Sequence, residues 1–99
     1  MILVVGHFRV PVDHIATIRP LMRKVIAATH AEDGCLSYAY AEDVAEPGLI
    51  RVSEAWRNRE CLTAHFQTPH MTRWQEERAG LGLYDREIKI WEVGEGEQV

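Results

Sequence analysis

Residues 54–74, EAWRNRECLTAHFQTPHMTRW, decide how this chain folds. A β-rich segment ends at Trp56, and Asn58 can then accept hydrogen bonds from the first turn of a helix. Thr68 followed by Pro69 supplies a second N-cap and a first-turn proline, so the helix is predicted to break and restart there. The stretch also contains two tryptophans and two histidines, more aromatic and titratable material than folding alone requires. We therefore expect a functional site here.

The segments on either side of this stretch predict one small α+β domain. An apolar strand precedes Pro11, Asp13 can cap a following helix, and Pro47-Gly48 joins two strands as a hairpin. The expected elements are strands at 2–10, 35–41, 49–56 and 83–93, with helices at 14–30 and 58–79. Their order is β-α-β-β-α-β, which predicts a ferredoxin-like, four-stranded antiparallel sheet with both helices on one face. Residues 1–93 form the domain, and 94–99 form a polar C-terminal tail.

The other face of this sheet needs a cover. Residues 2–10 are apolar at both strand parities, and an apolar face of that size is costly in water. A second copy of the chain is the simplest cover, and symmetric dimers are the commonest assemblies. We expect a homodimer with its sheets packed against each other.

Composition excludes several functional classes. The formal charge of the 99 residues is −4 and the basic residues are scattered, so we expect no nucleic-acid partner. Cys35 and Cys61 fit no metal-binding spacing and are interpreted as reduced thiols. The apolar run at the amino terminus is too short to cross a bilayer and follows no basic leader. We expect no membrane partner and a cytoplasmic location.

Two segments carry a resemblance to a known family. EDGCLSYAYAED (residues 32–43) and EAWRNRECLTAHFQTPHM (residues 54–71) resemble the antibiotic biosynthesis monooxygenase family of dimeric α+β barrels, which includes quinol monooxygenases and anthrone oxygenases. The resemblance implies oxidation of an electron-rich aromatic, a quinol or polyphenol, by molecular oxygen in an apolar cavity. It implies no metal and no flavin, and the sequence contains no Gly-rich dinucleotide loop, flavin motif or metal-ligand spacing.

The resemblance and the residue types together suggest a site. Trp56 matches the family's cavity tryptophan, whose indole can stack on a ligand and donate a hydrogen bond to its anion; the alternative is that Trp56 fills the core. His65 has a pKa range suited to a general base, or it is a histidine satisfied by a carbonyl. His7 is a third candidate catalytic residue, facing the cavity from the first strand. The expected substrate-binding residues are Tyr38, Phe66, His70, Met71 and Trp74, with local capping as the alternative role of His70.

Two other functions share this fold and these residues. The same cavity could sequester a small aromatic without catalysis, or it could support a muconolactone-type isomerase that needs acid–base groups but no oxygen. Anthrone oxygenation and haem degradation fit less well. The positions that anthrone oxygenases fill with Asn, Tyr and Arg hold Val52, Leu62 and Glu76 here. Consumption of oxygen separates the monooxygenase from the other two hypotheses.

Overall fold

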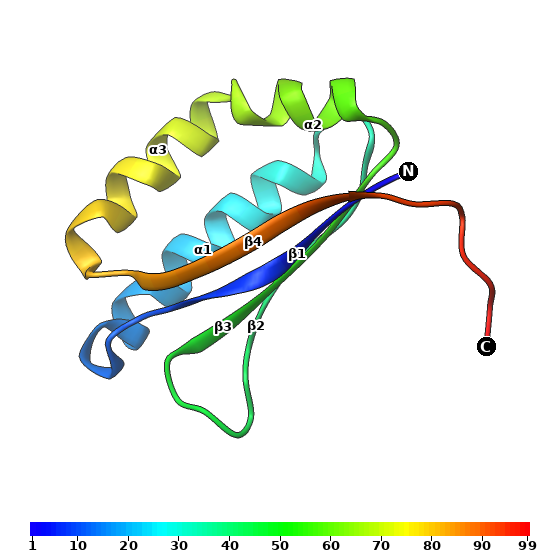
Figure 1. Cartoon of the computed structure of the whole chain (residues 1–99). Helices are drawn as coiled ribbons and strands as arrows, with labels where there is room; N and C mark the ends of the chain where they lie inside the picture. Colours follow the sequence, from blue (N-terminus) through cyan, green and yellow to red (C-terminus); the bar gives the residue numbers. More distant parts are fainter.

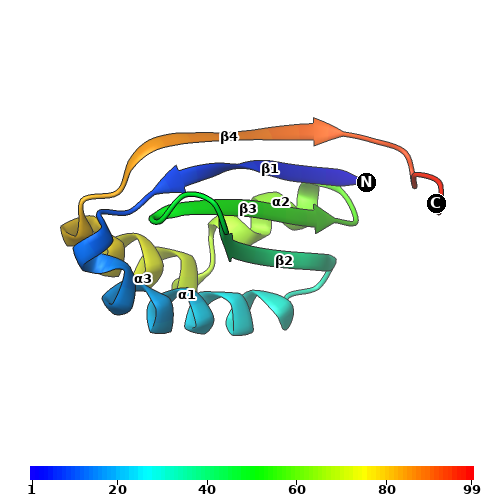
Figure 2. The same cartoon turned by 90° about the horizontal axis from the view of Figure 1, so that it is seen from below.

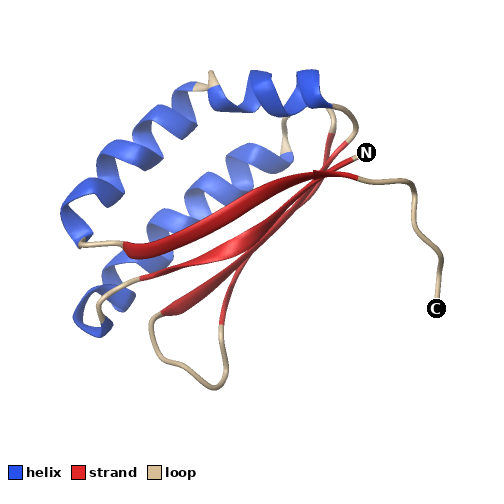
Figure 3. Cartoon of the chain, viewed as in Figure 1, coloured by secondary structure: helices blue, strands red, loops and turns tan.

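A computed structural model describes all residues 1–99 and contains the predicted ferredoxin-like α+β domain (Figures 1 and 3). Four strands form one sheet, and the helices lie together on one side of it. The elements, in chain order, are β1 (Ile2–Arg9), α1 (Ile15–His30), β2 (Cys35–Glu42), β3 (Leu49–Trp56), α2 (Arg59–Phe66), α3 (Pro69–Arg78) and β4 (Tyr84–Glu92).

The sheet is antiparallel throughout, in the order β2-β3-β1-β4 (Figure 2). β1 lies at its centre, between β3 and β4, and the helices cover only one face. β4 is therefore an edge strand, and its residues are largely exposed. This edge borders the cavity described below.

One predicted cap needs correction. Asp13 does not cap α1, because Val12–His14 form a short 3-10 turn before the helix and no side chain caps its first residues. The turn forms because the backbone N–H of His14 donates to the carbonyl of Pro11 at 2.8 Å. Asp13 therefore lies inside the turn rather than immediately before the helix.

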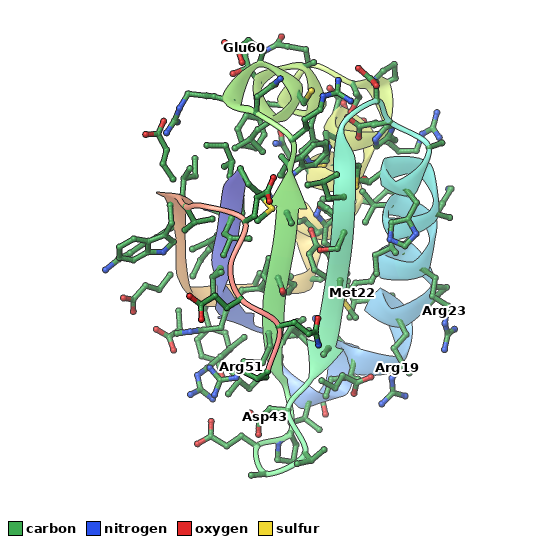
Figure 4. The ribbon with its side chains drawn as sticks, turned by 90° about the vertical axis from the view of Figure 1, so that its right-hand side faces the viewer. Arg19, Met22, Arg23, Asp43, Arg51 and Glu60 are labelled. Atoms are coloured by element: carbon green, nitrogen blue, oxygen red, sulfur yellow. The ribbon has the colours of Figure 1, made fainter.

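The core lies between the sheet and the helices. Alternation along β1 buries Ile2, Val4 and Phe8 against the helical layer, as expected for side chains that point to alternate faces. Helical spacing does the same for α1: Met22 is buried against the sheet, whereas Arg19 and Arg23 extend from its outer side (Figure 4). The fold thus leaves the inner sheet face available to line a cavity.

The break between α2 and α3 occurs where the sequence predicts it. The side chain of Asn58 accepts from the backbone N–H of Cys61 at 2.9 Å and caps α2. The Thr68 side chain accepts from the backbone N–H of Met71 to cap α3, and its hydroxyl donates to the carbonyl of His65 at 2.8 Å. The break therefore satisfies the carboxyl end of α2 and fixes the position of His65.

The sheet face opposite the helices carries apolar side chains that nothing in the chain covers. Leu3 pairs with Ala55 on one side and with Trp91 on the other, so these three side chains form a row across the sheet. Trp91 is 53% exposed, and Val5, on the same face of the sheet, is 46% exposed.

The chain contains no helix with the length and apolar character needed to span a bilayer.

Candidate active site

A cavity of about 260 Å³ lies between the inner face of the sheet and the helices α2 and α3. Its apolar wall includes Val4, Phe8, Val52, Phe66, Met71, Ile88 and Ile90. Its polar wall includes Tyr38, Tyr40, Glu54, His65, Arg78 and Arg86. A larger hollow of about 530 Å³ beside Glu32 and Arg57 is a surface depression, and only two of its eight lining residues are hydrophobic. The apolar cavity with converging polar groups is the better candidate for a small-molecule site.

His65 lies at the last turn of α2 and is 1% exposed. Its Nδ1 is 2.7 Å from the Oε2 atom of Glu32, and its ring packs against Trp56 in a tilted arrangement, with 4.7 Å between ring centres and 40° between the ring planes. Because a carboxylate only accepts hydrogen bonds, Nδ1 carries the proton and donates to Glu32. Nε2 has no hydrogen-bond partner in the protein and is free to accept a proton from a bound molecule.

Two opposing effects set the protonation of His65. Burial lowers the pKa of His65, and the hydrogen bond to Glu32 partly offsets that effect. The net direction is downward, which favours the neutral imidazole near pH 7. A neutral imidazole with a fixed Nδ1–H and an unpaired Nε2 is the form that a general base requires.

Glu32 also binds a second histidine. Nε2 of His70, in the first turn of α3, is 2.7 Å from the same Oε2 atom. Glu32, His65 and His70 place their ligand-type atoms within 4.8 Å of one another, and such groups could hold a transition metal. The 2.7 Å separations are hydrogen-bond lengths, however, shorter than the ~3.3 Å between ligands around a tetrahedral zinc ion. The structure therefore describes a hydrogen-bonded cluster that bridges α2 and α3.

Glu54 is the buried carboxyl of the cavity. It is 7% exposed, and burial raises the pKa of Glu54 to about 7. The indole Nε1–H of Trp56 donates to its Oε1 at 3.0 Å, which partly opposes that rise. A carboxyl that titrates near neutrality can give or take a proton during a reaction.

Trp56 is adjacent to the cavity but is not part of its wall. Its side chain is fully buried and packs in a cluster with Ile2 and Leu62. The expectation that its indole stacks on a ligand is corrected accordingly: the ring fills the core, and its N–H is already used by Glu54. Trp56 therefore contacts two cavity residues: it donates this hydrogen bond to Glu54, and its ring packs against the ring of His65.

Two tyrosines extend the polar wall. The hydroxyl groups of Tyr38 and Tyr40 are 2.8 Å apart, so one donates to the other. Burial raises the pKa of both phenols, which therefore stay protonated at neutral pH. The hydroxyl that accepts within the pair keeps its own hydrogen and can donate it to an oxygen of a ligand.

The other residues predicted for the site divide into two groups. Phe66 and Met71 line the cavity together with Tyr38. Trp74 does not, because it packs in the core against α1, and His70 reaches Glu32 instead of the cavity. His7 is on the opposite face of the sheet, 3.6 Å from Asp85, because its parity differs from that of Val4 and Phe8. The structure does not bring His7 to His65.

Comparison with known proteins places this geometry in a family. The model of the family described as antibiotic biosynthesis monooxygenase matches residues 1–77. The chain belongs to this family. A crystal structure of a provisionally named antibiotic biosynthesis monooxygenase from Deinococcus radiodurans superimposes with a TM-score of 0.92 at 30% identity, covering 100% of this chain and 98% of that one.

Two curated relatives are also similar to this chain, one named as an enzyme and one uncharacterized. "Probable quinol monooxygenase YgiN" of Escherichia coli is 29% identical over 89 residues, which cover 82% of this chain and 85% of that protein. An uncharacterized protein of Synechocystis sp., sll1783, is 35% identical over 94 residues, 95% of this chain. The matched region spans 64% of the length of the Synechocystis protein.

No role was predicted from the sequence for Glu54, Glu32, Arg78 or Arg86. A signal for Glu54 was present, since strand alternation puts it on the same face as Val52 and Trp56, where a carboxyl is unexpected. No local signal connects Glu32 to His65, which lies 33 residues further along the chain. Those two residues meet only in the folded chain, where the segment after α1 lies beside the last turn of α2.

Proposed function

We propose that this chain is a monooxygenase that oxidises an electron-rich aromatic, a quinol or polyphenol, with molecular oxygen in the cavity beneath α2 and α3. The observation that carries the proposal is the geometry of His65. This buried imidazole donates a hydrogen bond to Glu32, and its Nε2 atom is unpaired beside an apolar cavity. Family membership and the relatives named as monooxygenases support the reaction class.

The chemistry follows from the acidity of a phenol. His65 removes the phenolic proton, and the phenolate is a far better electron donor to oxygen than the phenol. The protonated tyrosine pair and Glu54 supply hydrogen bonds to the developing oxygen anions. The carbon–oxygen bond then forms at the ring, one oxygen atom stays in the product quinone, and the other leaves as water. The quinol itself supplies all four electrons, so the balance needs no further reductant.

Oxygen uptake tests the proposal directly. Purified protein with 1,4-dihydroxybenzene should consume oxygen above the spontaneous rate, and ¹⁸O₂ should label the hydroxyquinone product. Three results would each reject the monooxygenase: oxygen uptake that yields hydrogen peroxide and no ¹⁸O in the organic product, binding of the quinol without oxygen uptake, or an oxygen-independent isomerisation.

The role of His65 has its own test. His65→Ala should lower turnover about 100-fold or more, the usual contribution of a general base. His14→Ala is the matched control, because His14 bonds the Leu81 carbonyl outside the cavity and should leave turnover unchanged. Circular dichroism establishes that both variants fold. Wild-type turnover in a folded His65→Ala protein would reject the base assignment.

We infer in addition that two copies associate through the open sheet face. The row of Leu3, Ala55 and Trp91 with the exposed Val5 is an apolar surface without a partner in the chain. A second copy offers the same surface, and a two-fold axis would bury both. Sedimentation velocity should give a dimer that Trp91→Glu converts to a monomer. A monomeric wild-type protein at micromolar concentration would reject the inference.

A further inference from the structure

Two arginines stand where the cavity meets the surface. Arg78, at the end of α3, and Arg86, on β4, both line the cavity. Both also line an adjoining groove of about 390 Å³, whose other walls come from Gln75 of α3 and from the segment between α3 and β4. A molecule that enters the cavity from this groove passes the two guanidinium groups.

Neither guanidinium has a carboxylate within 4.0 Å. Other arginines of the chain do pair with carboxylates at this distance: Arg9, Arg19, Arg51, Arg57 and Arg59. Arg78 is half-buried, and its guanidinium lies 5.2 Å from the ring centre of Trp74, a cation–π contact that fixes its position. An unpaired, partly desolvated charge is unfavourable, so this site is incomplete without an anion.

The two positive charges also act on each other. Burial lowers the pKa of Arg78, and repulsion from Arg86 lowers it further. Glu54 is the one carboxyl in the cavity wall, and it forms no salt bridge with either arginine. Burial raises the pKa of Glu54 to about 7 against the electrostatic attraction of Arg86, which leaves this carboxyl partly neutral at pH 7. Positive charge therefore exceeds negative charge at this end of the cavity, although the chain as a whole carries −4.

The rest of the cavity determines what kind of anion fits. Its wall beyond the arginines is largely apolar and includes Phe8, Ile88 and Ile90. A volume of about 260 Å³ accommodates a small aromatic molecule. Guanidinium groups bind carboxylates through paired, charge-assisted hydrogen bonds.

We propose that the substrate is an aromatic acid, with its ring in the apolar part of the cavity and its carboxylate held by Arg78 and Arg86. This inference rests on the proposed function, because it concerns the same cavity, and it narrows the substrate from any quinol to one that carries a carboxylate. The carboxylate would orient the ring so that its phenol reaches His65.

Binding without oxygen tests the inference separately from catalysis. Anaerobic isothermal titration compares 2,5-dihydroxybenzoate with its neutral methyl ester, two quinols that differ in the charge of one group. Wild-type protein should bind the acid about tenfold more tightly or better, the equivalent of one charge-assisted hydrogen bond. Arg78→Met and Arg86→Met should lose this preference while they keep the affinity for the ester. Arg73→Met, on the same helix but outside the cavity, should retain it.

Each result has a definite meaning. Equal affinity for acid and ester, failure of both to bind at millimolar concentration, or an undiminished preference in folded Arg78→Met and Arg86→Met proteins would overturn the inference. Tight binding of the acid without oxygen uptake would uphold an aromatic acid as the ligand of the two arginines and would reject the oxygenase. Equal binding and equally rapid oxidation of the ester would uphold the oxygenase and reject the role of the arginines.

Discussion

Replacement of Glu54 by glutamine tests the electrostatics of the cavity. Burial raises the pKa of Glu54 from 4.5 to about 7. The folded state therefore binds this proton more tightly than the unfolded chain, so the contribution of Glu54 to stability is fully present below pH 4.5 and is lost as the pH rises to 7. One pKa unit corresponds to about 1.4 kcal/mol, so wild-type protein should lose about 3 kcal/mol across this interval through Glu54 alone.

Glutamine has nearly the same shape and keeps an oxygen that can accept from the indole of Trp56, but it does not ionise. Glu54→Gln and wild-type protein should therefore have similar free energies of unfolding at pH 4.5, and the variant should be about 2–3 kcal/mol more stable at pH 8. Urea denaturation at fixed protein concentration, repeated at half-unit steps of pH, measures the difference.

Glu87→Gln is the control for this series, because Glu87 is an exposed carboxyl on β4. Its difference from wild type should show no comparable slope between pH 4.5 and 7. If the free-energy difference between Glu54→Gln and wild type stays constant over that range, Glu54 is not a buried acid that titrates near neutrality, and its proposed role as a protonated hydrogen-bond donor in the cavity fails with it.

Three further predictions concern the base, a cap and metals. Glu32→Gln should lower oxygen uptake about tenfold, the equivalent of one charge-assisted hydrogen bond. It should also move the acidic limb of the pH–rate profile to lower pH, because Glu32 raises the pKa of His65. An acidic limb that does not move would contradict a positioning role for Glu32. Asn58→Ala should cost about 1 kcal/mol in urea denaturation through loss of the α2 cap, whereas Asn58→Asp should cost little, and equal losses would show that the cap is unimportant. EDTA should leave oxygen uptake unchanged. If EDTA abolishes uptake and one added divalent metal restores it, a metal would be assigned to the Glu32 cluster.

The fold could be predicted because its signals are local. Asn58, Thr68 and Pro69 each act on backbone groups within three residues, and strand alternation depends only on near neighbours. Asp13 misled the prediction because Pro11 starts a 3-10 turn, an alternative local structure that the capping pattern does not reveal.

The site could be predicted only in part, because its chemistry depends on contacts between distant segments. His65, Tyr38, Phe66 and Met71 carry recognisable side chains, and they do lie along the cavity. The role of Trp56 could not be read from its position, because the sequence does not show that its N–H binds Glu54. Residue type drew attention to His7, but strand parity places it on the other face.

Glu32 has a consequence for any attempt to reshape this protein. Its Oε2 atom accepts from two rings on two helices, so the joint between α2 and α3 is held by a residue that belongs to neither. Removal of the carboxylate alone would leave a buried imidazole without its acceptor, and removal of one ring alone would upset the pairing of the other. Positions 32, 65 and 70 should therefore be exchanged as one unit, and substitutions among them should be strongly non-additive.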